Sequence, residues 1–144
     1  MSEIHKITFH EIPPPEDLRV IREGYDRDTE KLIGEEGRRE LAFFVRDGDG
    51  EVVGGINGVY SNYGWLWIGL LWVKEDLRGQ GSGSQLMARI EEEARSNGCT
   101  NAYLNSFSFQ AVGFYQKLGD RIYGELDDFP PGQQVCALTK RLIP

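Results

Sequence analysis

The sequence is poor in the residues that build metal and redox sites. Its 144 residues include two cysteines and two histidines. Cys99 and Cys136 show no metal-ligand or redox spacing, so we expect two reduced, structural thiols and no metal site. His5 and His10 both lie in the N-terminal stretch, where we expect a structural or solvent-facing role rather than a catalytic one.

Long apolar runs and an excess of positive charge are also missing. The longest apolar run, residues 65–73, is far shorter than the about 20 residues of a membrane helix, and the N-terminus has no secretory signal pattern. The formal net charge is -7, whereas a nucleic-acid-binding protein needs a basic surface to neutralise phosphates. We therefore expect one soluble, cytoplasmic domain over residues 1–144 that contacts neither nucleic acid nor a membrane.

What the chain does contain is a glycine-rich turn between an apolar strand and an amphipathic helix. Gly79, Gly81 and Gly83 follow the strand that ends at Val73. The helix is predicted from apolar residues at helical spacing, namely Leu86, Met87, Ile90 and Ala94. The first amides of a helix lack internal partners, and glycines let an anion approach the main chain. The turn therefore predicts a phosphate site.

The spacing of this turn separates three kinds of phosphate-binding loop. A Walker loop requires a lysine after its last glycine, and none is present at that offset. The dinucleotide fingerprint fails because its last position is Ser84 when counted from Gly79, or Leu86 when counted from Gly81. The segment Arg78-Gly-Gln-Gly-Ser-Gly83 instead resembles the Arg/Gln-x-x-Gly-x-Gly/Ala motif of the GCN5-related N-acetyltransferase (GNAT) family, which holds the pyrophosphate of acetyl-CoA.

The pattern of the whole chain agrees with the α/β fold that this resemblance implies. Strands are predicted at 4–12, 41–46, 52–60, 65–73, 101–106, 121–126 and 134–142. Helices are predicted from residue 17 to about 34, as two short helices or one kinked helix around Gly24, then from 82 to 97 and from 111 to 119. The resemblance implies a GNAT fold, with a mixed, mostly antiparallel central sheet of roughly six to seven strands, about four helices on both faces, and a splay between strands four and five.

Residues 65–73 are predicted to form a central strand, because both of their faces are apolar. Gly69 interrupts this strand, which indicates close approach of another backbone or of a ligand. Trp65 and Trp67 point to the same side as Gly69 by alternation. They line a substrate pocket or fill the core, and the sequence favours neither.

The resemblance assigns acetyl-CoA, the acyl-donor cofactor, to the splay and the glycine turn. The pyrophosphate would bind the amides from Gln80 to Ser84, and the pantetheine arm would lie along the end of the fourth strand. The full expected set is Leu71, Trp72, Val73, Arg78, Gly79, Gln80, Gly81, Ser82, Gly83, Ser84 and Asn105. This chain has Ser108 where many relatives carry an asparagine, so that cofactor contact differs here.

A second motif supplies the catalytic candidate. Residues 111–119 match the family signature Ala-x-x-x-Tyr-x-Lys-x-Gly, which implies that Tyr115 is the acid that protonates the departing thiolate. A tyrosine with a pKa of about 10 can donate to a thiolate whose conjugate acid has a pKa of about 8.5. A backbone amide near Leu71 would stabilise the charge that develops on the thioester oxygen. The competing interpretation of Tyr115 is a core tyrosine, because its helix face is apolar.

The general base and the acceptor are not specified by the sequence. No acidic residue lies between Tyr63 and Lys74, where several relatives have a glutamate. The candidates by position are Glu23, Asp26, Glu40 and Asp127, and the alternative is bulk water. We expect direct transfer of acetyl to the primary amine of a small molecule. A non-catalytic acyl-CoA sensor of the same fold and a nucleotide-binding regulatory domain are the alternatives, and the resemblance leaves a homodimer open.

Overall fold

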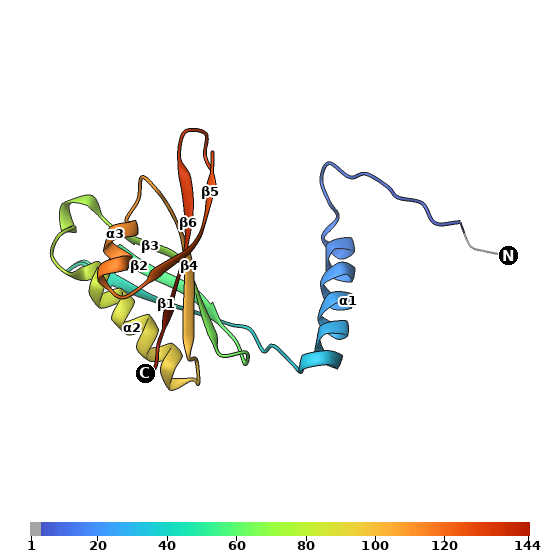
Figure 1. Cartoon of the computed structure of the whole chain (residues 1–144), viewed down its shortest axis with the longest axis horizontal. Coiled ribbons are helices and arrows are strands. Elements are labelled where there is room, and N and C mark those ends of the chain that lie inside the picture. Colours follow the sequence, from blue (N-terminus) through green and yellow to red (C-terminus); the bar gives the residue numbers. More distant parts are fainter. Residues whose placement is uncertain (1–3) are drawn as a thin grey trace. The chain divides into compact units, whose positions relative to one another are not determined.

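The computed structural model describes residues 4–144 and divides the chain into two compact units (Figure 1). The N-terminal unit runs to Glu36, and the second unit, called the body below, spans Gly37–Pro144. Among the described residues, no helix has both the length and the apolar character that a membrane span requires.

The N-terminal unit contains one helix, α1 (Pro15–Ile33). Proline suits the first helical position, and Glu16 and Asp17 lie at the positive end of the helix dipole. The helix ends where the amide of Gly34 donates to the Glu30 carbonyl. Gly24 lies inside α1, so of the two alternatives, two short helices or one kinked helix, the division into two helices is wrong and a single helix is found. One interior glycine costs only about 1 kcal/mol relative to alanine, which is too little to break a helix of this length.

The predicted first strand is also wrong, because residues 4–12 contain no strand in the structure. The hydrophobic side chains of this segment are all exposed. No side chain of α1 is buried either.

The body is built on one six-stranded sheet. Its strands are β1 (Arg39–Arg46), β2 (Val52–Tyr60), β3 (Trp65–Val73), β4 (Asn101–Phe107), β5 (Arg121–Asp127) and β6 (Gln134–Arg141). They lie in the order β1-β2-β3-β4-β6-β5, and every neighbouring pair is antiparallel except β3 and β4. The mixed, mostly antiparallel α/β sheet is therefore confirmed.

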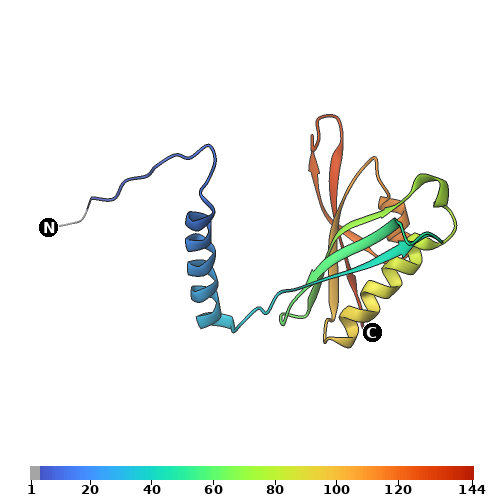
Figure 2. The same ribbon diagram turned by 180° about the vertical axis from the view of Figure 1, so that it is seen from behind.

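One face of the sheet carries the hydrophobic core. Helix α2 (Ser82–Ser96) packs on β1, β2 and β3, and the short helix α3 (Val112–Lys117) packs against β5 and the same core (Figure 2). A one-turn 3-10 helix, η1 (Glu75–Leu77), precedes α2. Leu66, Met87, Ile90 and Leu138 are almost completely buried. Each side chain of this kind stabilises the fold by about 1.5–3 kcal/mol relative to the exposed state.

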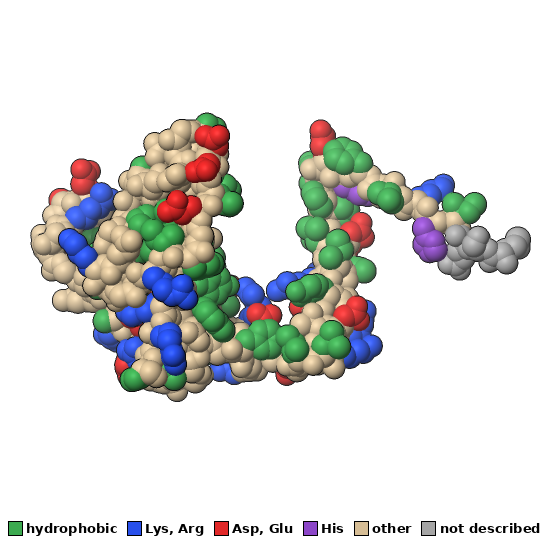
Figure 3. Space-filling model, viewed as in Figure 1, with side chains coloured by type: hydrophobic (Ala, Val, Ile, Leu, Met, Phe, Trp, Pro, Cys, Tyr) green, Lys and Arg blue, Asp and Glu red, His purple; other side chains and the backbone are tan. Residues whose placement is uncertain are grey.

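The other face of the sheet, called the bare face below, is not covered by any helix of the body. Trp65, Trp67, Trp72 and Phe44 are all exposed there, although they belong to the same strands as the core residues. Residues 4–144 contain three α-helices rather than four, and two of them, α2 and α3, belong to the body. Hydrophobic side chains are visible on the surface of α1 and in patches on the body in Figure 3.

Candidate active site

The strands β3 and β4 correspond to the fourth and fifth strands of the sequence prediction. They separate at the centre of the sheet, where the splay was predicted. Their parallel pairing covers only three residue pairs and ends at Trp67 and Tyr103. Beyond this point β3 stays paired with β2, and β4 stays paired with β6. In the described part of the chain, the peptide groups of 68–73 and 104–107 that face the gap have no strand partner. The gap therefore offers main-chain donors and acceptors to an extended, amide-containing ligand.

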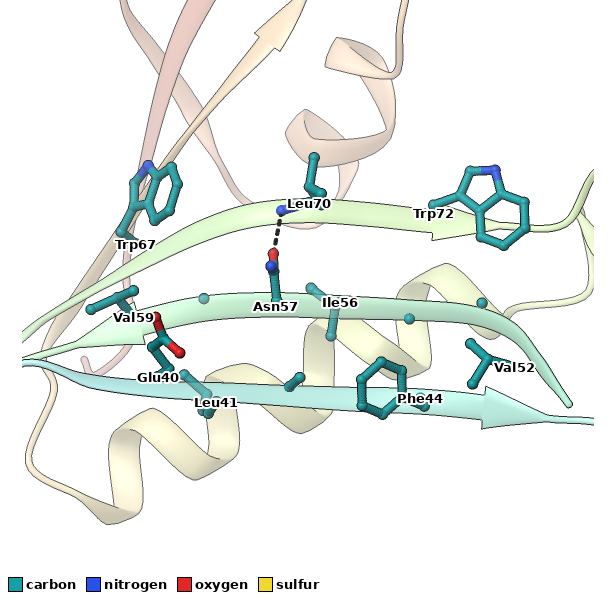
Figure 4. Close-up of a pocket in the computed structure, with 14 residues that line it drawn as sticks. Glu40, Leu41, Phe44, Val52, Ile56, Asn57, Val59, Trp67, Leu70 and Trp72 are labelled. Atoms are coloured by element: carbon teal, nitrogen blue, oxygen red, sulfur yellow. Dashed lines mark hydrogen bonds between the residues drawn. The ribbon is translucent and has the colours of Figure 1, made fainter. Parts of the chain in front are cut away.

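A β-bulge lies in β3 beside this gap, and sequence reasoning missed it. Ile56 pairs with Leu71 and Gly58 with Ile68, so β3 has one extra residue between them, at Gly69 and Leu70. The Leu70 amide donates to the Asn57 side-chain Oδ1 at 2.7 Å (Figure 4). A Cβ at Gly69 would lie only 2.7 Å from that oxygen, which explains the glycine. Asn57 and Gly69 were the sequence signals for this bulge.

The bulge shifts the alternation of side chains by one residue. Leu66 and Ile68 point to the core before it, and Leu71 and Val73 do so after it. Trp72 therefore lies on the bare face together with Trp67 and Leu70 (Figure 4). The expected common side of Trp65 and Trp67 is confirmed, and both belong to the exposed surface rather than to the core.

The glycine turn closes the end of β3 and begins α2. The Arg78 Nε donates to the Val73 carbonyl at 2.8 Å, which fixes the turn to the end of the strand. Gly79 and Gly81 have φ of 77° and 89°, a left-handed conformation that favours glycine. A Cβ at either position would meet open space, so the backbone conformation and not crowding requires them.

The N-terminus of α2 has amides that are available to a ligand. Gly81 is the N-cap and supplies no capping side chain, while its carbonyl accepts from the Gln85 amide at 3.0 Å. The amides of Ser82, Gly83 and Ser84 have no acceptor among residues 4–144. Gly83 has a second role, because its Cβ would lie 3.4 Å from the Phe114 ring of α3. The geometry is that of an anion site at a helix N-terminus.

Tyr115 lies on α3 with its ring partly buried against the core. It contacts Phe114 edge to face, with ring centroids 5.2 Å apart. Burial raises the pKa of the Tyr115 hydroxyl above its ordinary value, and the negative charge of Asp120 raises it further. The phenol therefore keeps its proton at neutral pH and can donate it.

A buried charged cluster lies beside this tyrosine. The Lys140 Nζ is 3.0 Å from Glu91 Oε1. The second carboxylate oxygen of Glu91 and the Oδ2 of Asp120 are buried, with no hydrogen-bond partner among the described residues. Burial raises the pKa of Asp120 to about 6; the Lys140 charge opposes this shift and the Glu91 charge adds to it. The cluster couples α2, β6 and the connection between α3 and β5 electrostatically.

Two residues near the end of β4, Asn105 and Ser108, bear on the expected cofactor contacts. Asn105 is exposed on β4 beyond the last residue paired with β3, so it lies beside the gap. Ser108, which replaces the asparagine of relatives, is engaged elsewhere: its Oγ accepts from the Gln134 amide at 3.0 Å and donates to Gln133 Oε1 at 2.9 Å. Ser108 thus holds the β5–β6 hairpin.

The structure separates the four candidate bases. Glu23 and Asp26 belong to the N-terminal unit, where Asp26 is 3.5 Å from Arg22. Asp127 accepts from the Gln134 side chain at 2.8 Å. Glu40 lies on β1, and β3 itself carries no acidic residue. Within residues 4–144, no group of three or more metal-ligating side chains is arranged to hold a metal ion.

Glu40 lines a hollow of about 670 Å³ on the bare face of β1, β2 and β3. Figure 4 shows that its walls are side chains of these three strands, mainly apolar ones such as Phe44, Trp67 and Trp72. Asn57 lies in its floor but is already bonded to the Leu70 amide. Small-molecule sites place several polar groups so that they converge on the ligand. This hollow lacks that feature and has the character of a packing surface.

A sheet that opens beside a bulged strand, with a glycine-capped helix at the wide end, is the fold of an acetyltransferase. A family profile described as "Acetyltransferase (GNAT) family" matches residues 2–120. The chain belongs to this family, and it is an acetyltransferase by that membership.

The relatives agree with this assignment. The chain is 39% identical over 134 residues to an acetyltransferase of Agrobacterium fabrum, covering 85% of this chain and 97% of that protein. It is 43% identical over 94 residues to the blasticidin-S acetyltransferase of Streptomyces morookaense, covering 65% and 68%. The crystal structure of an acetyltransferase from Bacillus cereus superposes with a TM-score of 0.84 at 32% identity, covering 93% of this chain and 97% of that one.

Proposed function

We propose that the protein transfers acetyl from acetyl-CoA to the primary amine of a small molecule, by direct attack within a ternary complex. One observation carries the proposal: the uncapped amides of Ser82, Gly83 and Ser84 lie at the end of the strand that borders the gap. An anion at these amides would leave its extended arm along β3. The name of the blasticidin-S relative supports a small-molecule acceptor.

The cofactor would be held mainly by main-chain groups. The pyrophosphate would accept from the amides between Gln80 and Ser84, stabilised by the dipole of α2. The pantetheine amides would bond to the open edge of β3 along Leu71, Trp72 and Val73, with Asn105 on the opposite side of the gap. Arg78 would act indirectly, because its Nε already holds the Val73 carbonyl.

The reaction would begin when the neutral amine attacks the thioester carbonyl carbon. A C–N bond forms, and negative charge moves to the carbonyl oxygen, where a main-chain amide stabilises it. The Leu70 amide already donates to Asn57, so the Leu71 amide, immediately after the bulge, is our candidate donor to the carbonyl oxygen. The C–S bond then breaks, and coenzyme A leaves as a thiolate.

Tyr115 would protonate this thiolate. Its raised pKa supports the role, because the hydroxyl stays protonated until the thiolate forms. The amine proton would pass to water, since no acidic residue lies on β3. Of the four candidate bases, Glu23 and Asp26 belong to the N-terminal unit, and Asp127 accepts a hydrogen bond from Gln134. Glu40 is the remaining candidate in the body.

The test follows free thiol while the protein is incubated with acetyl-CoA and a panel of amines that includes blasticidin S. We expect thiol release above the uncatalysed rate with at least one amine, and Tyr115→Phe should lower kcat by about ten- to a hundredfold without changing coenzyme A affinity. Tyr123→Phe, on an exposed tyrosine of β5, is the matched control.

Two results would contradict the proposal. Coenzyme A binding without thiol release for any amine would favour the acyl-CoA sensor. Full activity of Tyr115→Phe across pH would show that the tyrosine is only a packing residue. We also propose that both units form one acetyltransferase domain, because the family match spans residues of each.

A further inference from the structure

Three phenylalanine rings gather where β4 leaves the sheet, and we call them the phenylalanine cluster. Phe107 is the last residue of β4, Phe109 follows in the connection to α3, and Phe129 lies in the connection between β5 and β6. The rings of Phe107 and Phe109 are stacked, with centroids 5.3 Å apart and planes at 7°. The ring of Phe129 lies 5.9 Å from that of Phe107. Phe109 is 58% exposed and Phe129 is 51% exposed, so part of each ring is open to a ligand.

Hydrogen bonds to main-chain groups hold the segment that carries two of these rings. The Phe107 amide donates to the Gln110 side chain at 3.0 Å, and the Gln110 amide donates to the Phe107 carbonyl at 2.9 Å. The Ser108 amide donates to the Gln134 carbonyl at 2.8 Å, which ties this segment to the β5–β6 hairpin. A surface that is already held in place loses little conformational entropy when a ligand binds to it.

The cluster lies beside the gap between β3 and β4. The pairing of β4 with β3 ends at Tyr103, so Asn105 and Phe107 belong to the part of β4 that borders the gap. They point to one side of this strand by alternation, opposite to the buried Leu104 and Ser106. Two residues of a strand span about 7 Å. A molecule whose amine reaches the gap at Asn105 can therefore extend its remaining part to the cluster.

The segments that carry the cluster have acidic residues and no basic ones. Residues 101–116 contain no charged side chain, and the charged residues of 122–139 are Glu125, Asp127 and Asp128. All three are exposed, and Figure 3 shows acidic side chains gathered over the β5–β6 hairpin. A region with charges of one sign attracts ligands of the opposite sign. The charge around the cluster therefore favours a cation.

Aromatic rings and carboxylates together favour one class of ligand. A planar group stacks on a phenylalanine ring, and a cation within about 6 Å of the ring centroid is attracted to the face of the ring. Nearby carboxylates add attraction for the same cation and repel an anion. A flat cation such as an amidine or a guanidine satisfies both the rings and the carboxylates.

We propose that the phenylalanine cluster selects the acceptor, and that the preferred acceptors are primary amines that carry a second, planar cationic group. This inference rests on the proposed function, because it names the acceptor of that transfer, and the bonds that form and break are the same. The planar cation would lie on the half-exposed rings of Phe109 and Phe129, beside the carboxylates of the hairpin. The primary amine would reach the gap near Asn105.

Three acceptors of the same shape test the selection by charge. The compounds are para-(aminomethyl)benzamidine, para-(aminomethyl)benzamide and para-(aminomethyl)benzoate. They share the reacting amine and a planar ring, and their second group is cationic, neutral or anionic. With saturating acetyl-CoA at pH 7, we expect kcat/KM from thiol release to be about tenfold higher for the amidine than for the amide, and lowest for the benzoate. Equal values for the three compounds would overturn the inference.

Two matched pairs of variants locate the selection. Phe109→Leu removes a ring of the cluster, and its control Phe44→Leu removes a ring of the same 58% exposure from β1, at the edge of the sheet. Asp128→Asn and its control Asp49→Asn each remove one exposed negative charge. Asp128 has φ 54°, a conformation that asparagine also adopts, so the hairpin should keep its shape.

The measured quantity is the ratio of kcat/KM for the amidine to kcat/KM for the amide. We expect this ratio to fall about fivefold in Phe109→Leu and about threefold in Asp128→Asn, and to change by less than about 1.5-fold in the two controls. Equal falls in Asp128→Asn and Asp49→Asn would mean that only the net charge of the chain matters. Equal falls in the two phenylalanine variants would mean that the cluster has no special role. Either result would overturn the inference.

Calorimetry separates a failure of this inference from a failure of the proposed transfer. With coenzyme A present, which has no acetyl group to transfer, the dissociation constant should be about tenfold lower for the amidine than for the amide, and Phe109→Leu should reduce this difference. Thiol release without any preference among the three compounds would overturn the inference and leave the transfer standing. No thiol release with any amine would overturn the transfer, and equal dissociation constants would then overturn the inference as well.

Discussion

The two faces of the central sheet are built from alternate residues of the same strands, yet the side chains of one face are buried and many of the other are exposed. On β3, Leu66 is completely buried under α2, whereas its neighbour Trp67 is 38% exposed on the bare face. Both residues are hydrophobic, so hydrophobicity does not distinguish them. The difference arises from the elements available to cover each face. The covered face has α2 and α3 from the body, and the bare face has no helix from residues 37–144.

The largest expected effect separates the two faces by stability. Leu66→Ala should lower the free energy of unfolding by about 3–5 kcal/mol, because it leaves a cavity in a core that cannot collapse around it. Trp67→Ala should cost less than about 1.5 kcal/mol, because the Trp67 side chain is 38% exposed on the bare face. Chemical denaturation measures both values. Equal costs would mean that Trp67 is as closely packed in solution as Leu66.

The sequence predicted the covered face well because its signals are local. The apolar residues of 65–73, the glycine turn and the stripe of Leu86, Met87 and Ile90 each lie within one element, and all were found in the predicted places. The apolar character of both faces of β3 was also read correctly. It predicted a cover on each side, and the body provides only one.

The parts that the sequence did not predict depend on partners that are distant in the chain. Residues 4–12 have a strand composition, but a strand exists only where another strand pairs with it. The bulge at Gly69 requires Asn57, which lies on the neighbouring strand and supplies the missing acceptor for the Leu70 amide. Gly24 suggested a break in α1, and the surrounding helix overrode this local preference.

The second effect tests whether the cofactor site belongs to the covered side alone. Gly81→Val should weaken coenzyme A binding by about a hundredfold, because the left-handed turn that presents the amides of α2 cannot form without strain. Calorimetry or competition with a labelled coenzyme measures this.

Gly132→Val is the matched control for this change. Gly132 has φ 80° in the β5–β6 turn and, like Gly81, meets open space at its Cβ position. The two variants therefore carry the same backbone strain, of about 1–2 kcal/mol. If both weaken coenzyme A binding to the same extent, the loss reflects strain and not a cofactor site at α2.

The candidate site could be named residue by residue from its motifs but not completed. The roles of the Arg78 to Gly83 motif and of Tyr115 were predicted from their resemblance to two family motifs, and they remain predictions. The buried cluster of Asp120, Glu91 and Lys140 was not predicted. Its members lie on three separate elements, and no spacing in the sequence indicates that they meet.

The smallest effect tests this cluster, whose charges lie on the covered side and are shielded from water. Burial raises the pKa of Asp120 from 3.8 to about 6 in the folded protein. The folded state therefore binds more protons than the unfolded state between about pH 4 and pH 6, and this group's contribution to stability is lost as the pH rises through that range. Asp120→Asn carries no charge at any pH, so its stability relative to the wild type should increase by about 2 kcal/mol from pH 4 to pH 7.

Asp49→Asn, in the exposed β1–β2 turn, is the control for replacing a surface carboxylate by an amide. The same Asp120 variant should also lower the pKa of Tyr115, because the Asp120 charge is one of the two causes that raise it. The alkaline limb of the rate profile should then move to lower pH, although Asp120 need not contact either substrate. A flat stability difference between pH 4 and pH 7 would mean that Asp120 is solvated, and that the charged cluster is no more shielded than the charges of the bare face.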